Sequence, residues 1–147
     1  MHTIITKNMP VVLIVAFTLL ACSGCPRGPQ RPADMPKPIP CIIYVSFGGE
    51  TLPGVSVYLT PEDKKVNQWG AGGLTDAEGR AVLKTNAAFE GVVPGNYIIS
   101  FRKLAEPVGM NTPPSLIPDK YTLGKSKETI AVSEDQTEYR FDLDGLK

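Results

Sequence analysis

Three cysteines, Cys22, Cys25 and Cys41, are the side chains of this chain best suited to covalent chemistry or metal binding. Cys22 and Cys25 are three positions apart, a spacing that also occurs in zinc sites and redox pairs. The only histidine is His2, so a mature protein that has lost its N-terminal segment contains none. Such a protein has no Ser-His-Asp or Cys-His arrangement and no histidine ligand for a metal. We therefore expect no catalysis, no metal and no cofactor.

The residues before Cys22 have the features of a secretion signal. Residues 11–21 (VVLIVAFTLLA) are apolar without interruption. About eleven such residues suit the core of a signal peptide, whereas a membrane-spanning helix needs about 20. The stretch LLAC (residues 19–22) resembles the bacterial lipobox, with an aliphatic residue three positions before a cysteine and a small residue directly before it. This resemblance implies that residues 1–21 are a lipoprotein signal peptide and that Cys22 becomes the acylated first residue.

Two alternatives remain open for this segment. It could be a short uncleaved anchor helix, or Cys25 could be the modified residue, which would put Cys22 where the lipobox has an aliphatic side chain. With Cys22 modified, two or three acyl chains would give stable anchoring in a membrane of the cell envelope, facing the periplasm or the cell surface. Ser23 follows the cysteine, where aspartate resembles an inner-membrane retention signal. The outer membrane is therefore favoured.

The two remaining cysteines are predicted to pair. An envelope compartment outside the cytoplasm is oxidising, and lipidation of Cys22 leaves Cys25 and Cys41 as the available thiols. We therefore predict a disulfide between Cys25 and Cys41. In the chain-entropy model, closing a loop of about 15 residues stabilises the fold by roughly 3 kcal/mol.

Trp69 is the one candidate for ligand contact. It is the only tryptophan and lies in the glycine-rich stretch VNQWGAGG (residues 66–73). An exposed indole could stack on a sugar ring or anchor a protein partner; alternatively it closes the end of the core. Two acidic pairs are interpreted structurally. Asp76 and Glu78 lack the spacing of an EF-hand calcium loop and belong to a tight turn, and Asp142 with Asp144 indicates a solvated strand edge.

The rest of the chain must position these residues, and it divides into a linker and a domain. Residues 22–40 contain six prolines, which favour an extended polyproline conformation and indicate a semi-rigid stalk. From residue 41 the apolar residues alternate with period two, and no segment has a helical stripe. Fifteen basic and fifteen acidic residues give a formal net charge of zero, which gives no indication of nucleic-acid binding.

The alternation predicts an all-β domain over residues 41–147. Six short strands separated by turn residues are typical of a sandwich or barrel. The strands are expected near residues 42–47, 55–60, 81–84, 97–102, 130–133 and 138–143. A seventh is expected at residues 71–75 or 120–123. Residues 105–119, with four prolines, are predicted to form a long loop or crossover.

Three stretches resemble the carboxypeptidase regulatory-like domain. They are LPGVSVYLTP (residues 52–61), GGLTDAEGRAVL (72–83) and VPGNYIISFRK (93–103), in which Thr75, Asp76 and Gly79, then Pro94, Gly95 and Tyr97, match the pattern of that family. Ala81 departs from its usual aromatic residue. The C-terminal region is similar to that of transthyretin-like bacterial lipoproteins. The resemblance implies a single prealbumin-like or immunoglobulin-like β-sandwich of about seven strands, without an active site.

We therefore expect a non-enzymatic, lipid-anchored envelope protein with a binding or assembly module. Its partners would be the membrane, through Cys22, and an envelope protein or a glycan. Two alternatives from other classes are a carbohydrate-binding accessory module that uses Trp69, and a structural small subunit of an envelope complex.

Overall fold

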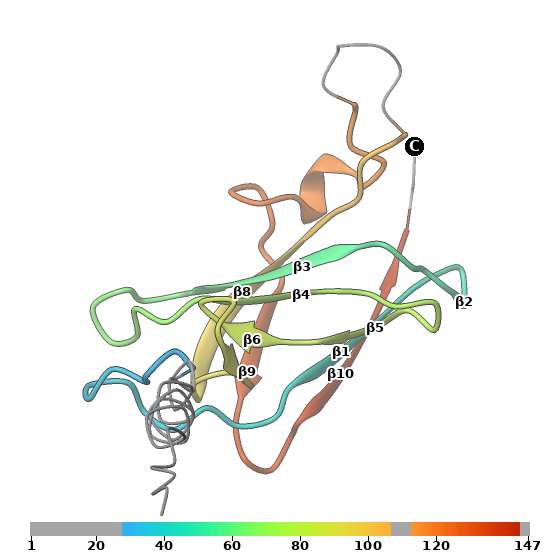
Figure 1. Cartoon of the computed structure of the whole chain (residues 1–147). Coiled ribbons are helices and arrows are strands. Elements are labelled where there is room, and N and C mark those ends of the chain that lie inside the picture. Colours follow the sequence, from blue (N-terminus) through green and yellow to red (C-terminus); the bar gives the residue numbers. More distant parts are fainter. Residues whose placement is uncertain (1–27, 107–112, 145–147) are drawn as a thin grey trace, which may run out of the picture. The chain divides into compact units, whose positions relative to one another are not determined.

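A computed structural model describes residues 28–106 and 113–144 of the chain (Figure 1). The contacts divide the chain into two units, Met1–Gln30 and Arg31–Lys147. The predicted signal peptide, Cys22 and Cys25 lie outside the described residues. The second unit carries the strands and is the part described below.

The second unit is all-β and consists of two sheets. The first sheet has the order β10 (Glu138–Leu143), β1 (Ile42–Phe47) and β2 (Glu50–Thr51), with β5 (Arg80–Val82) also paired to β1. The second sheet has the order β7 (Phe89–Glu90), β6 (Lys84–Thr85), β4 (Ala71–Leu74), β3 (Ser56–Pro61), β8 (Gly95–Arg102) and β9 (Thr129–Val132). All the pairs of named strands are antiparallel except β1 with β10, which run parallel.

Period-two alternation places one face of each long strand in the core. On β3, Val57, Leu59 and Pro61 are buried, while Tyr58 and Thr60 between them are only half-buried. The same alternation on β1, β8 and β10 contributes the other large core side chains, among them Ile43, Val45, Tyr97, Ile99, Phe101 and Leu143. Because both sheets bury one face in the same cluster, the arrangement is that of a β-sandwich. The all-β prediction is confirmed at this level.

The described residues contain ten strands, more than the predicted seven or so, and seven of the ten are three or more residues long. Of the ten strands in the described residues, β2, β6 and β7 are only two residues long, and the other seven include β4 at Ala71–Leu74. Residues 120–123, the other position predicted for the seventh strand, do not form a strand, so that alternative is wrong. Asp119–Tyr121 is instead a short 3-10 helix, η2, in which Tyr121 N–H donates to Pro118 O and Thr122 N–H donates to Asp119 O.

The boundary between linker and domain differs from the sequence prediction. The proline-rich run was expected to extend as a stalk to residue 40, but residues 31–40 belong to the same compact unit as the sandwich. Met35 and Ile39 are buried, and Ile39 exchanges two backbone hydrogen bonds with Val92, of 2.9 and 2.8 Å. We call residues 31–40 the entry segment. Its prolines keep it out of a regular strand, because proline has no backbone N–H to donate to a neighbouring strand.

The turn predicted at Asp76 and Glu78 forms as expected. Asp76 Oδ1 accepts the Glu78 and Arg80 N–H groups at 3.1 and 2.8 Å, and Gly79 has a φ of +70°. This is turn chemistry.

Asp142 and Asp144 do more than line a solvated edge. Asp142 accepts the Ser46 hydroxyl at 3.0 Å, and Asp144 pairs with Lys120 at 2.5 Å, a contact that holds the pKa of the Asp144 carboxyl below its ordinary value.

Candidate binding pocket around Trp69

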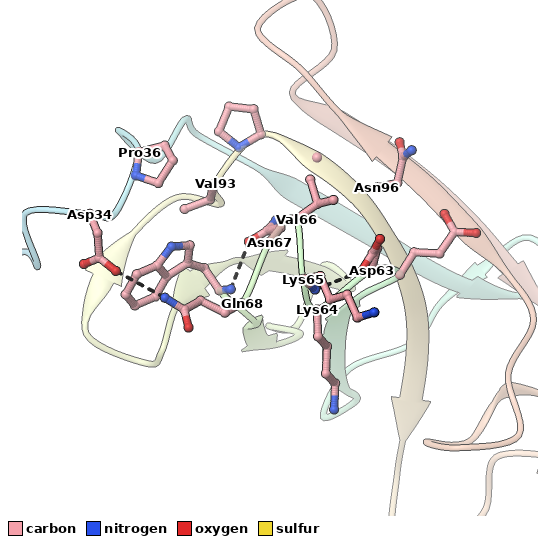
Figure 2. A pocket seen from close by; sticks show the side chains of 14 residues that line it. Asp34, Pro36, Asp63, Lys64, Lys65, Val66, Asn67, Gln68, Val93 and Asn96 are labelled. Atoms are coloured by element: carbon pink, nitrogen blue, oxygen red, sulfur yellow. Dashed lines mark hydrogen bonds between the residues drawn. The ribbon is translucent and has the colours of Figure 1, made fainter.

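A pocket of about 520 Å³ lies at the end of the sandwich where β3 ends and β4 and β8 begin (Figure 2). Three segments far apart in sequence form it: residues 34–36 of the entry segment, residues 62–69 of the β3–β4 connection, and residues 93–96 at the start of β8. Trp69, the predicted ligand contact, lines this pocket and is half-buried. The pocket volume is within the range of small-molecule sites.

The β3–β4 connection begins with a tight turn centred on Asp63. The Asp63 carboxylate accepts the Lys65 N–H at 2.8 Å, while its backbone carbonyl accepts the N–H groups of Val66 and Asn67. An aspartate that bonds to the backbone two residues further on is a common way to fix a turn. The consequence is a defined tip, at which Lys64 and Lys65 are exposed and the Val66 side chain is 85% exposed.

Asn67 connects the tryptophan loop to the sheet. Its Oδ1 accepts the Trp69 N–H at 2.9 Å, and its Nδ2 donates to the Tyr97 hydroxyl at 2.7 Å. Tyr97 is fully buried on β8 and donates in turn to Val93 O at 2.6 Å. Burial raises the pKa of the Tyr97 hydroxyl, so it keeps the proton that it donates. The backbone of Trp69 is thereby tied to a rigid strand by two side chains.

The entry segment forms the opposite wall. Gln68 Nε2 donates to Asp34 Oδ2 at 3.2 Å, a contact visible in Figure 2. The segment is held against the sandwich by Ile39 and Met35, which are 7% and 3% exposed. Asp34 and Pro36, which line the pocket, are themselves exposed. The wall therefore depends on residues that the sequence assigned to a stalk.

The side chains of the lining are suited to non-covalent recognition. Three carboxylates (Asp34, Glu62 and Asp63) and two ammonium groups (Lys64 and Lys65) nearly balance in charge, and all five side chains are exposed. The described residues of the lining include no serine, threonine, cysteine or histidine. No group of three or more histidine, cysteine or acidic residues in the described part of the chain is placed to hold a metal ion.

The sequence singled out Trp69 as a candidate contact, which stays a prediction, but it did not reveal the side chains that hold the Trp69 loop. The only local signal was Asn67, which stands two residues before Trp69 and could have suggested a side-chain-to-backbone turn. Tyr97 was noted only for the family resemblance, and Asp34 was placed in the stalk. Their roles depend on contacts across 30 and 34 residues, so the local pattern could not reveal them.

Cys41 is buried in the core, 1% exposed, and no disulfide joins it to another described residue. Burial raises its pKa to about 12. Its predicted partner, Cys25, lies outside the described residues, so the disulfide stays a prediction. A bond to Cys41 would require Cys25 to reach the core.

We expect Cys41 to resist alkylation by iodoacetamide in the folded full chain at pH 8, because the thiol is both buried and protonated. Mass mapping after unfolding in urea then decides its state. Labelling without a reductant would show a free thiol, whereas labelling only after reduction would support the Cys25–Cys41 bond. Rapid labelling of the native protein would contradict the burial.

Comparisons with protein families, with curated proteins and with solved structures gave no match for this chain.

Proposed function

We propose that this chain is a non-enzymatic, lipid-anchored protein of the bacterial cell envelope, whose β-sandwich binds a ligand through the Trp69 pocket. The observation that carries the binding role is the pocket itself: a half-buried indole held in place by the Asn67–Tyr97 link. The lipobox-like residues 19–22 and the apolar run before them support the anchor. No helix in the described ranges is long and apolar enough to cross a membrane.

We further propose that the sandwich is of the prealbumin-like type found in carboxypeptidase regulatory-like domains. Two motifs of the resemblance have structural roles that support it. Asp76 and Gly79 form the turn into β5, and Pro94 with Gly95 starts β8, the strand that carries Tyr97. Domains of that family accompany other activities and contain no active site, which agrees with a binding role.

The anchor has a direct test. In the Cys22→Ala variant we expect the protein to leave the membrane fraction, because no acyl chain can be attached. Fractionation and mass analysis of the N-terminal peptide measure this, with Cys25→Ala as the matched control that should stay in the membrane. Unchanged membrane retention of Cys22→Ala, or loss of it in Cys25→Ala, would overturn anchoring through Cys22.

A second candidate function is a structural subunit of an envelope complex. It is favoured by two leucines, Leu74 and Leu123, that are 63% and 64% exposed. Leu123 lines a groove of about 540 Å³ over β3 and β4, which also includes Tyr58. Crosslinking of the lipidated protein in native membranes tests this function: a defined complex that Leu74→Ser and Leu123→Ser both weaken would support it, and crosslinks to no protein would reject it.

A further inference from the structure

We propose that the ligand of the Trp69 pocket is a neutral saccharide, with the indole as the surface on which a sugar ring stacks. This inference rests on the proposed function, because it names the ligand class of the same site. It returns to one of the alternatives raised by the sequence and supports it from the surroundings of Trp69.

The first argument is the chemistry of the lining. Trp69, Val93 and the two prolines Pro36 and Pro94 provide an apolar surface, and the exposed side chains of Gln68 and Asn96 provide amides that both donate and accept. A sugar ring presents C–H groups on its faces and hydroxyls around its rim. Such a ligand needs one apolar surface and several planar polar groups around it, which is the combination found here.

The second argument is charge. The carboxylates of Asp34, Glu62 and Asp63 face the same pocket as the ammonium groups of Lys64 and Lys65. A polyanion such as a nucleic acid would need a clear basic excess, and a polycation would need an acidic one. A neutral ligand is not repelled by either sign of charge, and its hydroxyls can donate to the carboxylates and accept from the lysines.

The third argument is preorganisation. The hydrogen bonds from Trp69 N–H to Asn67 and from Asn67 to Tyr97 fix the loop before any ligand arrives, so little ordering cost accompanies binding. The Gln68–Asp34 contact, in contrast, joins two exposed side chains at 3.2 Å. Exposed polar contacts contribute little to stability. Gln68 and Asp34 are therefore free to exchange this bond for bonds to ligand hydroxyls.

The same geometry favours binding over cleavage. Glycoside hydrolysis requires a carboxylic acid kept protonated by a buried, apolar environment, in addition to a second carboxylate at a defined separation. All three carboxylates of this pocket are exposed. We therefore assign to Asp34, Glu62 and Asp63 a hydrogen-bonding role, and to Asn67 and Tyr97 a positioning role.

The experiment uses Trp69 as its own reporter, since it is the only tryptophan. The lipidated full chain in detergent micelles is titrated with the neutral tetrasaccharide of N-acetylglucosamine, and its fluorescence is followed. We expect a saturable change. Isothermal calorimetry then compares variants: Trp69→Ala should weaken binding at least about 10-fold, and Trp69→Phe should retain part of it. Tyr44→Ala, which removes an aromatic side chain of β1 outside the pocket, should leave binding unchanged.

Several outcomes would overturn the saccharide assignment. These are no saturable change up to about 50 mM tetrasaccharide, equal affinity in Trp69→Ala and the parent, and hydrolysis of the tetrasaccharide. Stronger binding to a sulfated oligosaccharide than to the neutral sugar would also contradict it, in favour of an anionic ligand. The lipid on Cys22 is measured separately by mass analysis. A failed saccharide titration with a lipidated protein therefore leaves the anchor intact, and an unlipidated protein that binds the sugar rejects only the anchor.

Discussion

In the Gly91→Ala variant we expect the sandwich to lose about 3 kcal/mol or more of its free energy of unfolding. Gly91 has a φ of +92°, which costs an alanine about 1–2 kcal/mol. A β-carbon at this position would also lie 2.8 Å from the carbonyl carbon of Ile39. The entry segment would have to move away, with loss of the two Ile39–Val92 hydrogen bonds and partial exposure of Ile39. Urea denaturation of the full chain, followed by circular dichroism, measures the change.

The matched control is Gly48→Ala. Gly48 also has a positive φ, +57°, but apart from its two chain neighbours no residue has an atom within 4 Å of a β-carbon placed there. We therefore expect only the backbone cost of about 1–2 kcal/mol. A second readout follows from the pocket wall: when the entry segment moves, Asp34 leaves Gln68, and acrylamide should quench Trp69 fluorescence more strongly. Equal destabilisation by the two variants would show that Gly91 does not hold the entry segment in place.

The parts of this fold that could be predicted are those in which burial alternates along several consecutive residues. β1, β3, β8 and β10 have this pattern over six or eight residues, and the sequence locates each of them. The two-residue strands β2, β6 and β7 are too short to show any period. The prediction of a strand at residues 120–123 was wrong for a related reason. Their alternation is brief, and the local turn, in which Thr122 N–H donates to Asp119 O, determines the conformation.

The entry segment was assigned to the stalk because its proline content was given more weight than its buried apolar residues. Prolines predict an extended chain, and the segment is extended, but extension does not distinguish a solvated stalk from a strand-like edge packed on a sandwich. The deciding residue is Ile39, a buried side chain between two prolines, whose partner Val92 is far away in sequence. The pocket could not be predicted for the same reason. Trp69 is identifiable from the sequence as an unusual side chain, but two of the three segments that line the pocket are brought to it only by tertiary pairing.

In the Tyr97→Phe variant we expect a loss of about 1–3 kcal/mol in the free energy of unfolding, together with a looser Trp69 loop. The Tyr97 hydroxyl donates to Val93 O at 2.6 Å and accepts from Asn67 Nδ2 at 2.7 Å, at a position with no solvent exposure. Phenylalanine fills the same space, so the core stays packed while both groups lose this partner. Because Asn67 also accepts the backbone N–H of Trp69, the loop should become more mobile, and Trp69 fluorescence anisotropy should fall.

Tyr139→Phe separates the two effects. Its hydroxyl also has two partners, Ala131 O at 2.6 Å and Gln136 O at 2.9 Å, but these oxygens belong to β9 and to the connection between β9 and β10. Its removal should cost stability without changing Trp69 anisotropy or saccharide affinity. Tyr97→Phe should change all three, because its hydroxyl lies on the path from the buried strand to the loop. If Tyr97→Phe lowered stability but left Trp69 as rigid as before, the Asp63 turn alone would be sufficient to position the pocket.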